Sequence, residues 1–357
     1  MPARSPSEER VLKACAFEQP DRIPRFDEFW GELPKSWREQ LGPAADSSDV
    51  EIWVPHEAAF PTRARHLKEE GGYVYEVDEW GRTLRRREGA YFAQTLEVPL
   101  PPGVDPDSVQ FDPPDMENRF LKGSRAETLE ALSKARARYC VFAKTGGPFL
   151  RTSWVRGEEQ FLADIAQDPA LARALADKVC DHLTAIGIEA LRRWSLQDTG
   201  IWIFDDMAYN EGPMFHPRAF ERILLPAYRR MISRYKEAGA RYVFLHSDGD
   251  IRLLLDMLID AGIDGINPVE RRANMDVVAL RKRYPKLVLA AEMDNSGTMI
   301  QGPVERIRAE AREIIGVGRH GGVIICGSLS PDMPPAHFLA YHETCVSESD
   351  FSGQQRS

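Results

Sequence analysis

The feature that most constrains the fold is a regular alternation of short apolar runs with helical segments, which begins near residue 137. The apolar runs occupy residues 139–143, 201–204, 242–245, 265–267, 287–291 and 323–325. Between them, apolar positions recur every three or four residues over 157–166, 169–194, 217–237, 250–261, 275–284, 303–315 and 334–344, which predicts helices. Uniformly apolar strands that alternate with helices are typical of a parallel sheet covered by helices. The pattern therefore predicts an α/β protein.

A closed barrel and an open doubly wound sheet both satisfy this alternation. No GxGxxG segment follows an early strand, and polar residues follow nearly every late strand instead of only one or two. We therefore predict a (β/α)8 barrel of the TIM type. A length of 357 residues is compatible with one such unit, so residues 1–357 are predicted to form a single domain.

The first third of the chain departs from this alternation. Residues 6–17 form a predicted amphipathic helix with Val11, Leu12 and Cys15 on one face, which we expect to cap the barrel. Residues 73–86 predict a β-hairpin that turns near Gly81, and a proline-rich connection follows up to Pro114. A hairpin and proline-rich insertion is accordingly expected over 70–115.

Composition excludes several classes of protein. The net charge of -9 and the short, interrupted basic stretches argue against a nucleic-acid partner. The chain contains five cysteines without a CxxC pair, which favours a reducing compartment. No stretch approaches the ~20 apolar residues that span a bilayer, and the first residues lack an apolar leader. A cytoplasmic protein without a membrane partner is expected, and a homo-oligomer is compatible with the sequence.

Residues that directly follow the strands of a barrel line its catalytic mouth. After the run 201–204 come two adjacent carboxylates, a phenol and an amide, namely Asp205, Asp206, Tyr209 and Asn210. A carboxylate among apolar walls can transfer protons because burial raises its pKa toward neutrality. The alternative interpretation is that Asp205 or Asp206 caps a turn or pairs with an arginine.

The later strand ends carry side chains that are typical of metal ligands. His246 and Asp248 follow one strand, Glu270 and Glu292 follow the next two, and Cys326 follows the last. Zinc selects imidazole, thiolate and carboxylate ligands, so His246, Asp248, Glu292 and Cys326 are candidate ligands. Each also has a structural interpretation, as a hydrogen-bonding core residue, a helix cap or buried apolar filler.

Several segments, taken in order, resemble one known group of barrels. They are EERVLKA with PDRIP (8–14, 20–24), DEWG (78–81), the stretch from Asp205 to Pro213, HSDG with GIDGINP (246–249, 262–268) and SPDMPP (330–335). As a set they are similar to the uroporphyrinogen decarboxylase-like superfamily. This (β/α)8-barrel group includes the decarboxylase itself and the corrinoid-dependent methyltransferases.

Two departures from the superfamily pattern bear on the activity. The decarboxylase carries an arginine-rich N-terminal loop, whereas residues 25–31 here read RFDEFWG, so an acidic porphyrinogen would meet Asp27 and Glu28. The methyltransferase branch holds zinc with a His-x-Cys pair and a later cysteine. This chain has His246 and Cys326 at similar places, with Asp248 where the first cysteine would be.

The resemblance therefore implies a corrinoid-linked methyltransferase. Zinc would be held by His246, Cys326 and either Asp248 or Glu292, and a methyl group would pass between a small substrate and cobalamin on a partner protein, or folate. The expected catalytic residues are Asp205, Asp206, Tyr209, Asn210 and Glu270. The expected substrate contacts are Arg25, Trp30, Arg151 and Asn267.

Two other functions remain open at this point. A metal-free decarboxylase-like lyase would use Asp205 or Asp206 to stabilise an electron-deficient ring and Arg25 or Arg151 to hold a carboxylate. A non-catalytic barrel that binds a small molecule is the third hypothesis.

Overall fold

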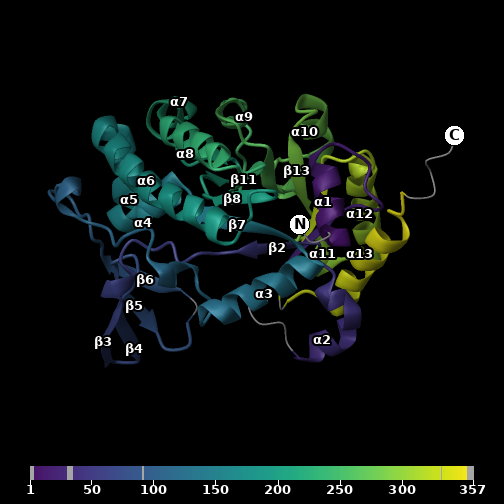
Figure 1. Ribbon diagram of the computed structural model, residues 1–357, viewed down its shortest axis with the longest axis horizontal. Coiled ribbons are helices and arrows are strands. Elements are labelled where there is room, and N and C mark those ends of the chain that lie inside the picture. Colours follow the sequence, from purple (N-terminus) through teal and green to yellow (C-terminus); the bar gives the residue numbers. More distant parts are fainter. Residues whose placement is uncertain (1–3, 30–34, 91, 331, 352–357) are drawn as a thin grey trace.

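In the computed structural model, the described part of the chain comprises residues 4–29, 35–90, 92–330 and 332–351. Eight parallel strands form one sheet (Figure 1), whose spatial order is β1 (Arg25–Phe29), β14 (Val323–Leu329), β13 (Val288–Glu292), β12 (Gly265–Val269), β11 (Tyr242–His246), β8 (Gly200–Phe204), β7 (Cys140–Gly146) and β2 (Val50–Trp53). The two end strands, β1 and β2, adjoin, because the Asp49 N–H beside β2 donates to the Arg25 carbonyl at 2.8 Å. The sheet is thus nearly closed, and the predicted (β/α)8 barrel is confirmed.

Helices connect the successive strands, and most of them lie where the apolar spacing predicted. They are α4 (Pro148–Arg156), α5 (Glu158–Gln167), α6 (Pro169–Arg193), α7 (Pro217–Ala219), α8 (Leu225–Glu237), α9 (Leu255–Ala261), α10 (Val277–Arg283), α11 (Thr298–Gln301), α12 (Val304–Gly318) and α13 (Pro335–Ser347). The start of α6 shows why the sequence folds this way: Pro169 occupies the first turn and the Asp168 side chain accepts from the Leu171 N–H at 3.1 Å. Among the described helices, none is both long enough and apolar enough to cross a membrane.

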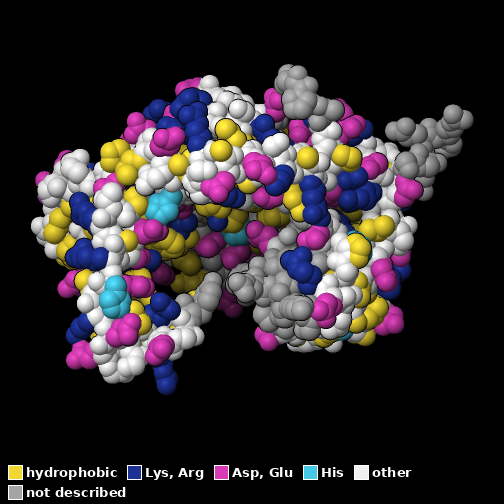
Figure 2. All heavy atoms as spheres, turned by 60° about the horizontal axis from the view of Figure 1, so that its bottom comes forward, with side chains coloured by type: hydrophobic (Ala, Val, Ile, Leu, Met, Phe, Trp, Pro, Cys, Tyr) yellow, Lys and Arg dark blue, Asp and Glu magenta, His cyan; other side chains and the backbone are white. Residues whose placement is uncertain are grey.

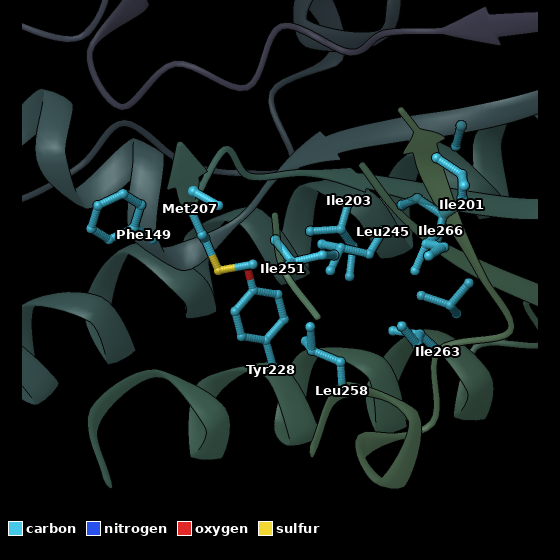
Figure 3. Close-up of a cluster of buried hydrophobic side chains, with 14 of the residues drawn as sticks. Phe149, Ile201, Ile203, Met207, Tyr228, Leu245, Ile251, Leu258, Ile263 and Ile266 are labelled. Carbon is cyan, nitrogen blue, oxygen red and sulfur yellow. The ribbon is translucent and has the colours of Figure 1, made fainter. Parts of the chain in front are cut away.

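The strands are apolar on both faces because one face lines the barrel interior and the other packs against the surrounding helices. Phe244 and Trp202 stack inside the barrel with ring centroids 4.9 Å apart. The next residues, Leu245 and Ile203, instead point outward and pack under the helices, where Figure 3 shows them beside Ile266. This double burial explains the uniform apolar runs and the absence of strict alternation.

The N-terminal helix α1 (Pro6–Cys15) closes one end of the barrel. Its Val11, Leu12 and Cys15 pack with Val50 and Cys140, which begin β2 and β7. Since α1 covers the end where strands begin, the opposite end, where strands finish, is left for the site.

Two barrel strands and several helices lie outside the segments predicted from sequence, among them β1, β2, α4 and α11. The resemblance places residues 25–31 where the decarboxylase has a loop, but Arg25–Phe29 is strand β1. The sequence pattern does not predict β2. The charges of β1 hide its pattern: Phe26 enters the barrel core, while Arg25 and Asp27 form an ion pair of 2.5 Å. Helix α3 (Arg125–Arg138) begins with a capping box between Ser124 and Glu127, but its apolar face is weak.

The accessory layer is larger than the predicted hairpin. It is a four-stranded antiparallel sheet of β3 (Arg65–Glu70), β4 (Tyr73–Val77), β5 (Thr83–Arg87) and β6 (Ala93–Glu97), which begins before residue 70. The hairpin turn near Gly81 lies between β4 and β5, and the Asp78 side chain accepts from the N–H groups of Trp80 and Arg82. Helix α2 (Lys35–Leu41) lies well apart from the accessory sheet, at the lower right of Figure 1.

Candidate active site

A cavity of about 1280 Å³ opens at the carboxyl ends of the barrel strands. Figure 2 looks into a hollow beside the accessory sheet, where acidic and hydrophobic side chains gather. The carboxylates in the cavity lining are Glu28, Asp206, Glu211, Asp248, Glu270 and Glu292. The only cationic or titratable basic groups that line it, within the described residues, are Lys144 and His246. The cavity is therefore strongly acidic.

Three of these side chains approach one another closely enough to share a metal ion. His246 Nε2 lies 3.7 Å from Asp206 Oδ1 and 3.6 Å from Asp248 Oδ1. One ligand atom from each residue falls within 4.8 Å of the others. Asp206 follows β8, whereas His246 ends β11 and Asp248 comes two residues later, so neighbouring strands bring the group together. We call Asp206, His246 and Asp248 the acidic triad.

The imidazole of His246 is held in one orientation by two contacts. Its Nδ1 lies 2.5 Å from Asn267 Oδ1, and its ring stacks on Phe204 with centroids 4.1 Å apart. Because an amide oxygen can only accept, Nδ1 carries a proton, and Nε2 faces the two aspartates. This arrangement is typical of a metal-binding histidine supported by a hydrogen-bond acceptor.

Glu292 and Cys326 line the same cavity but do not belong to the acidic triad. The Cys326 thiol accepts from Asn267 Nδ2 at 3.6 Å, and burial raises its pKa well above the usual value. Burial, reinforced by Glu270 and Asp248, also raises the pKa of Glu292 to about 8. The four ligands predicted from sequence therefore divide: His246 and Asp248 come together with Asp206, while Glu292 and Cys326 stand apart as neutral groups.

The two adjacent aspartates after β8 point in different directions. Asp205 is fully buried outside the cavity lining and accepts from the N–H groups of Phe149 at 2.9 Å and Leu150 at 2.6 Å, as well as from the Tyr228 hydroxyl. It thereby caps α4, and burial raises its pKa to about 6. The structural alternative considered for Asp205, a cap, is the geometry observed, while Asp206 faces the cavity.

The remaining predicted catalytic residues lie around the rim. Tyr209 and Asn210 belong to a small hairpin of β9 (Ala208–Tyr209) and β10 (Gly212–Pro213), and both line the cavity. Glu270 follows β12 in the same lining, and burial, with the Asp248 charge, raises its pKa. Their catalytic roles stay predictions.

Of the predicted substrate contacts within the described residues, only Asn267 lines the cavity. Arg25 is buried in its ion pair with Asp27 and approaches His342 Nδ1 at 2.5 Å. Arg151 also lies outside the lining, where it pairs with Glu57 Oε1 at 2.5 Å. Trp30 lies outside the described residues.

Sequence reasoning missed Lys144, which lies in β7, one residue beyond the predicted end of that strand. Glu28, expected to face a bound substrate, lines the cavity from the unpredicted strand β1. The available signal at Lys144 was a charged side chain at the end of an apolar run.

A barrel with convergent ionisable groups at its strand ends is the arrangement of a TIM-barrel enzyme. A family model described as uroporphyrinogen decarboxylase (URO-D) matches residues 98–347, and the chain belongs to this family. The superfamily resemblance drawn from the sequence is thereby confirmed. The family contains decarboxylases and methyltransferases, so membership establishes the kind of enzyme but leaves the reaction open.

Solved structures agree on the fold. A methyltransferase from Methanosarcina mazei superimposes with a TM-score of 0.64 at 14% identity, covering 96% of this chain and 98% of that one. At this identity the similarity demonstrates the fold alone. A mannanase from Bacillus subtilis reaches a TM-score of 0.48 at 8% identity, covering 95% and 94% of the two chains, and it supports no inference. A search of curated proteins gave no match.

Proposed function

We propose that this protein is a metal-dependent methyltransferase that moves a methyl group between a small substrate and a corrinoid or folate carrier. The observation that carries the proposal is the acidic triad at the strand ends, in which His246 Nε2 faces two carboxylates. An imidazole and two carboxylates suit a divalent ion such as zinc, and the separation of the donors fits one ion. The donor set contains no thiolate, which distinguishes it from the set predicted by resemblance.

A zinc ion in this position would act as a Lewis acid that lowers the pKa of the heteroatom losing or accepting the methyl group. The residues of the chain prepare the site for this chemistry. Asn267 and Phe204 hold His246 in place, and Glu292, with its pKa near 8, retains a proton that it can donate at neutral pH.

The cavity is large enough for two reactants. Its volume of about 1280 Å³ exceeds the ~300–1,000 Å³ typical of single ligand pockets. A small methylated molecule would leave room for the carrier, which we propose to be cobalamin presented by a partner corrinoid protein, with folate as the other candidate.

The alternative of a metal-free lyase is disfavoured by the positions of the arginines. In such a mechanism, Arg25 or Arg151 would hold the carboxylate of the substrate. Both arginines are instead buried in ion pairs outside the cavity lining. Arg271 and Arg272 line a smaller adjoining pocket of about 160 Å³. Methyl transfer agrees better with a cavity whose lining is dominated by carboxylates.

Metal analysis of the purified protein tests the proposal. We expect one zinc per chain, with affinity reduced at least tenfold in Asp206→Asn, His246→Gln and Asp248→Asn, since each removes a ligand atom. Glu292→Gln and Cys326→Ser should retain the metal, and the exposed residues His320 and Asp260 provide matched controls as His320→Gln and Asp260→Asn. Competition with a chromogenic chelator gives the affinities.

The same proteins are then assayed for formation of methylcobalamin or methylfolate from methylated amines and aryl methyl ethers. Loss of zinc should abolish methyl transfer. Absence of bound metal, or carbon dioxide release that resists a chelator, would contradict the proposal. If Cys326→Ser loses zinc as His246→Gln does, the result would favour the ligand set implied by the resemblance, in which Cys326 binds the metal.

A further inference from the structure

Lys144 places a positive charge directly beside the acidic triad. Its Nζ lies 3.7 Å from the centroid of the Phe204 ring, and the His246 imidazole stacks on that same ring at 4.1 Å. A stacked imidazole covers one face of a ring, so the ammonium must occupy the other face. Lys144 Nζ and the centroid of the His246 ring therefore lie on opposite faces of Phe204, at most about 7.8 Å apart.

The Lys144 ammonium has no carboxylate partner at salt-bridge distance within the part of the chain that the structure describes. Its pKa is lowered, chiefly by burial, while the more distant carboxylates of Glu57, Glu28 and Asp206 favour the charged form. An ammonium that is half-buried without a partner is costly, and an anionic ligand group would remove that cost. The cation is thus available for a ligand.

The other charged groups in the cavity lining favour a cationic ligand group instead of an anionic one. The two aspartates of the acidic triad would balance the charge of a divalent ion. Glu28, Glu211 and Glu270 also line the cavity, and no cation of the described residues lies at salt-bridge distance from them. Burial raises the pKa of Glu28 and Glu270, which reflects the cost of keeping negative charge in this space. A cationic group on the ligand would reduce this cost.

We propose that the substrate is a small zwitterion of the N-methylated amino acid class, with its carboxylate on Lys144 and its methylated nitrogen beside the acidic triad and Glu270. The separation of at most about 7.8 Å between Lys144 Nζ and the His246 ring leaves room for a molecule in which one or two carbons join the nitrogen to the carboxylate. The assignment of the methylated end rests on the proposed methyl transfer, whereas the carboxylate contact with Lys144 does not.

Calorimetry with three probes of nearly equal shape tests both ends of the ligand. Dimethylglycine is the zwitterion, dimethylethanolamine keeps the cation but replaces the carboxylate by a hydroxyl, and isovalerate keeps the carboxylate but replaces the cationic nitrogen by carbon. We expect dimethylglycine to bind the full chain roughly ten to a hundred times more tightly than dimethylethanolamine, because a charge-assisted hydrogen bond is lost. Isovalerate should bind less tightly than dimethylglycine.

Variants assign the carboxylate preference to one side chain. Lys144→Met keeps the apolar stem against Phe204 and should abolish the preference for dimethylglycine over dimethylethanolamine, whereas Lys144→Arg should retain it. Arg272→Met, in the adjoining pocket, is the matched control and should bind all three probes as the wild type does.

The proposal is overturned if dimethylethanolamine binds the wild type as tightly as dimethylglycine, or if dimethylglycine does not bind. It also fails if the preference survives in Lys144→Met or is lost in Arg272→Met, and equal binding of isovalerate refutes the cationic end. Each titration is run on zinc-loaded and on chelator-treated protein. Failure of the proposed function appears as absent zinc or absent methyl transfer, whereas failure of this inference appears only in the ranking of the probes.

Discussion

At the scale of single residues, Asn267 has the most consequential position in the site. Its amide accepts from His246 Nδ1 and donates to the Cys326 thiol, so it joins the acidic triad to the neutral groups of the cavity. Neither contact is visible in sequence, where Asn267 is simply a polar residue at the end of an apolar run. The resemblance implied that Cys326 is a zinc ligand. In the structure, the Asn267 side chain lies between Cys326 and His246.

Replacing Asn267 by leucine removes the acceptor for Nδ1 while keeping a similar volume. We expect zinc affinity to fall ten- to a hundredfold, as is typical when the hydrogen-bond partner of a histidine ligand is lost. Asn295→Leu, which removes an amide from the same cavity lining without touching His246, should have little effect. Chelator competition measures both, and equal losses in the two variants would contradict the positioning role of Asn267.

At the scale of elements, the strand-end rule predicted which residues lie at the cavity where the strands themselves were apolar. Asp206, His246 and Asp248 were all found this way, since β8 and β11 are recognisable as buried runs. Orientation was beyond the sequence: Asp205 and Asp206 are adjacent and chemically identical, and only packing against α4 decides which one faces the cavity. The missed residue Lys144 and the missed strand β1, which carries Glu28, lie where charges obscure a strand or its end.

Because Asp205 caps α4 and also bonds Tyr228, its replacement should act on stability. We expect Asp205→Asn to lower the free energy of unfolding by roughly 2–4 kcal/mol, since a buried charge-assisted cap is lost. Tyr228→Phe removes one of the same hydrogen bonds and should cost about 1 kcal/mol. Urea unfolding measures both effects. A folded Asp205→Asn protein of normal stability that has lost zinc would instead favour a direct role in the site.

At the scale of the whole molecule, the accessory segment is tied to the barrel by buried polar contacts. His182 in α6 approaches the Glu57 carbonyl at 3.2 Å and packs edge-on against Phe111, so it links a barrel helix to the segments that precede and follow the accessory sheet. Burial, together with the nearby Arg119 charge, lowers the pKa of His182 to about 4. The attachment therefore depends on an uncharged imidazole.

This dependence predicts sensitivity to acid with a definite sign. The unfolded chain binds a proton at His182 below its ordinary pKa of about 6.5, whereas the folded protein binds one only near pH 4. The unfolded state thus holds more protons between these values, and the contribution of His182, on the order of 3 kcal/mol, is full above pH 6.5 and lost as the pH falls to 4. His182→Gln, which keeps a hydrogen-bonding side chain without titrating, should reduce the slope of the free energy of unfolding against pH in that interval. The exposed His320→Gln should leave the slope unchanged, and an unchanged slope in His182→Gln would assign the acid sensitivity to other groups.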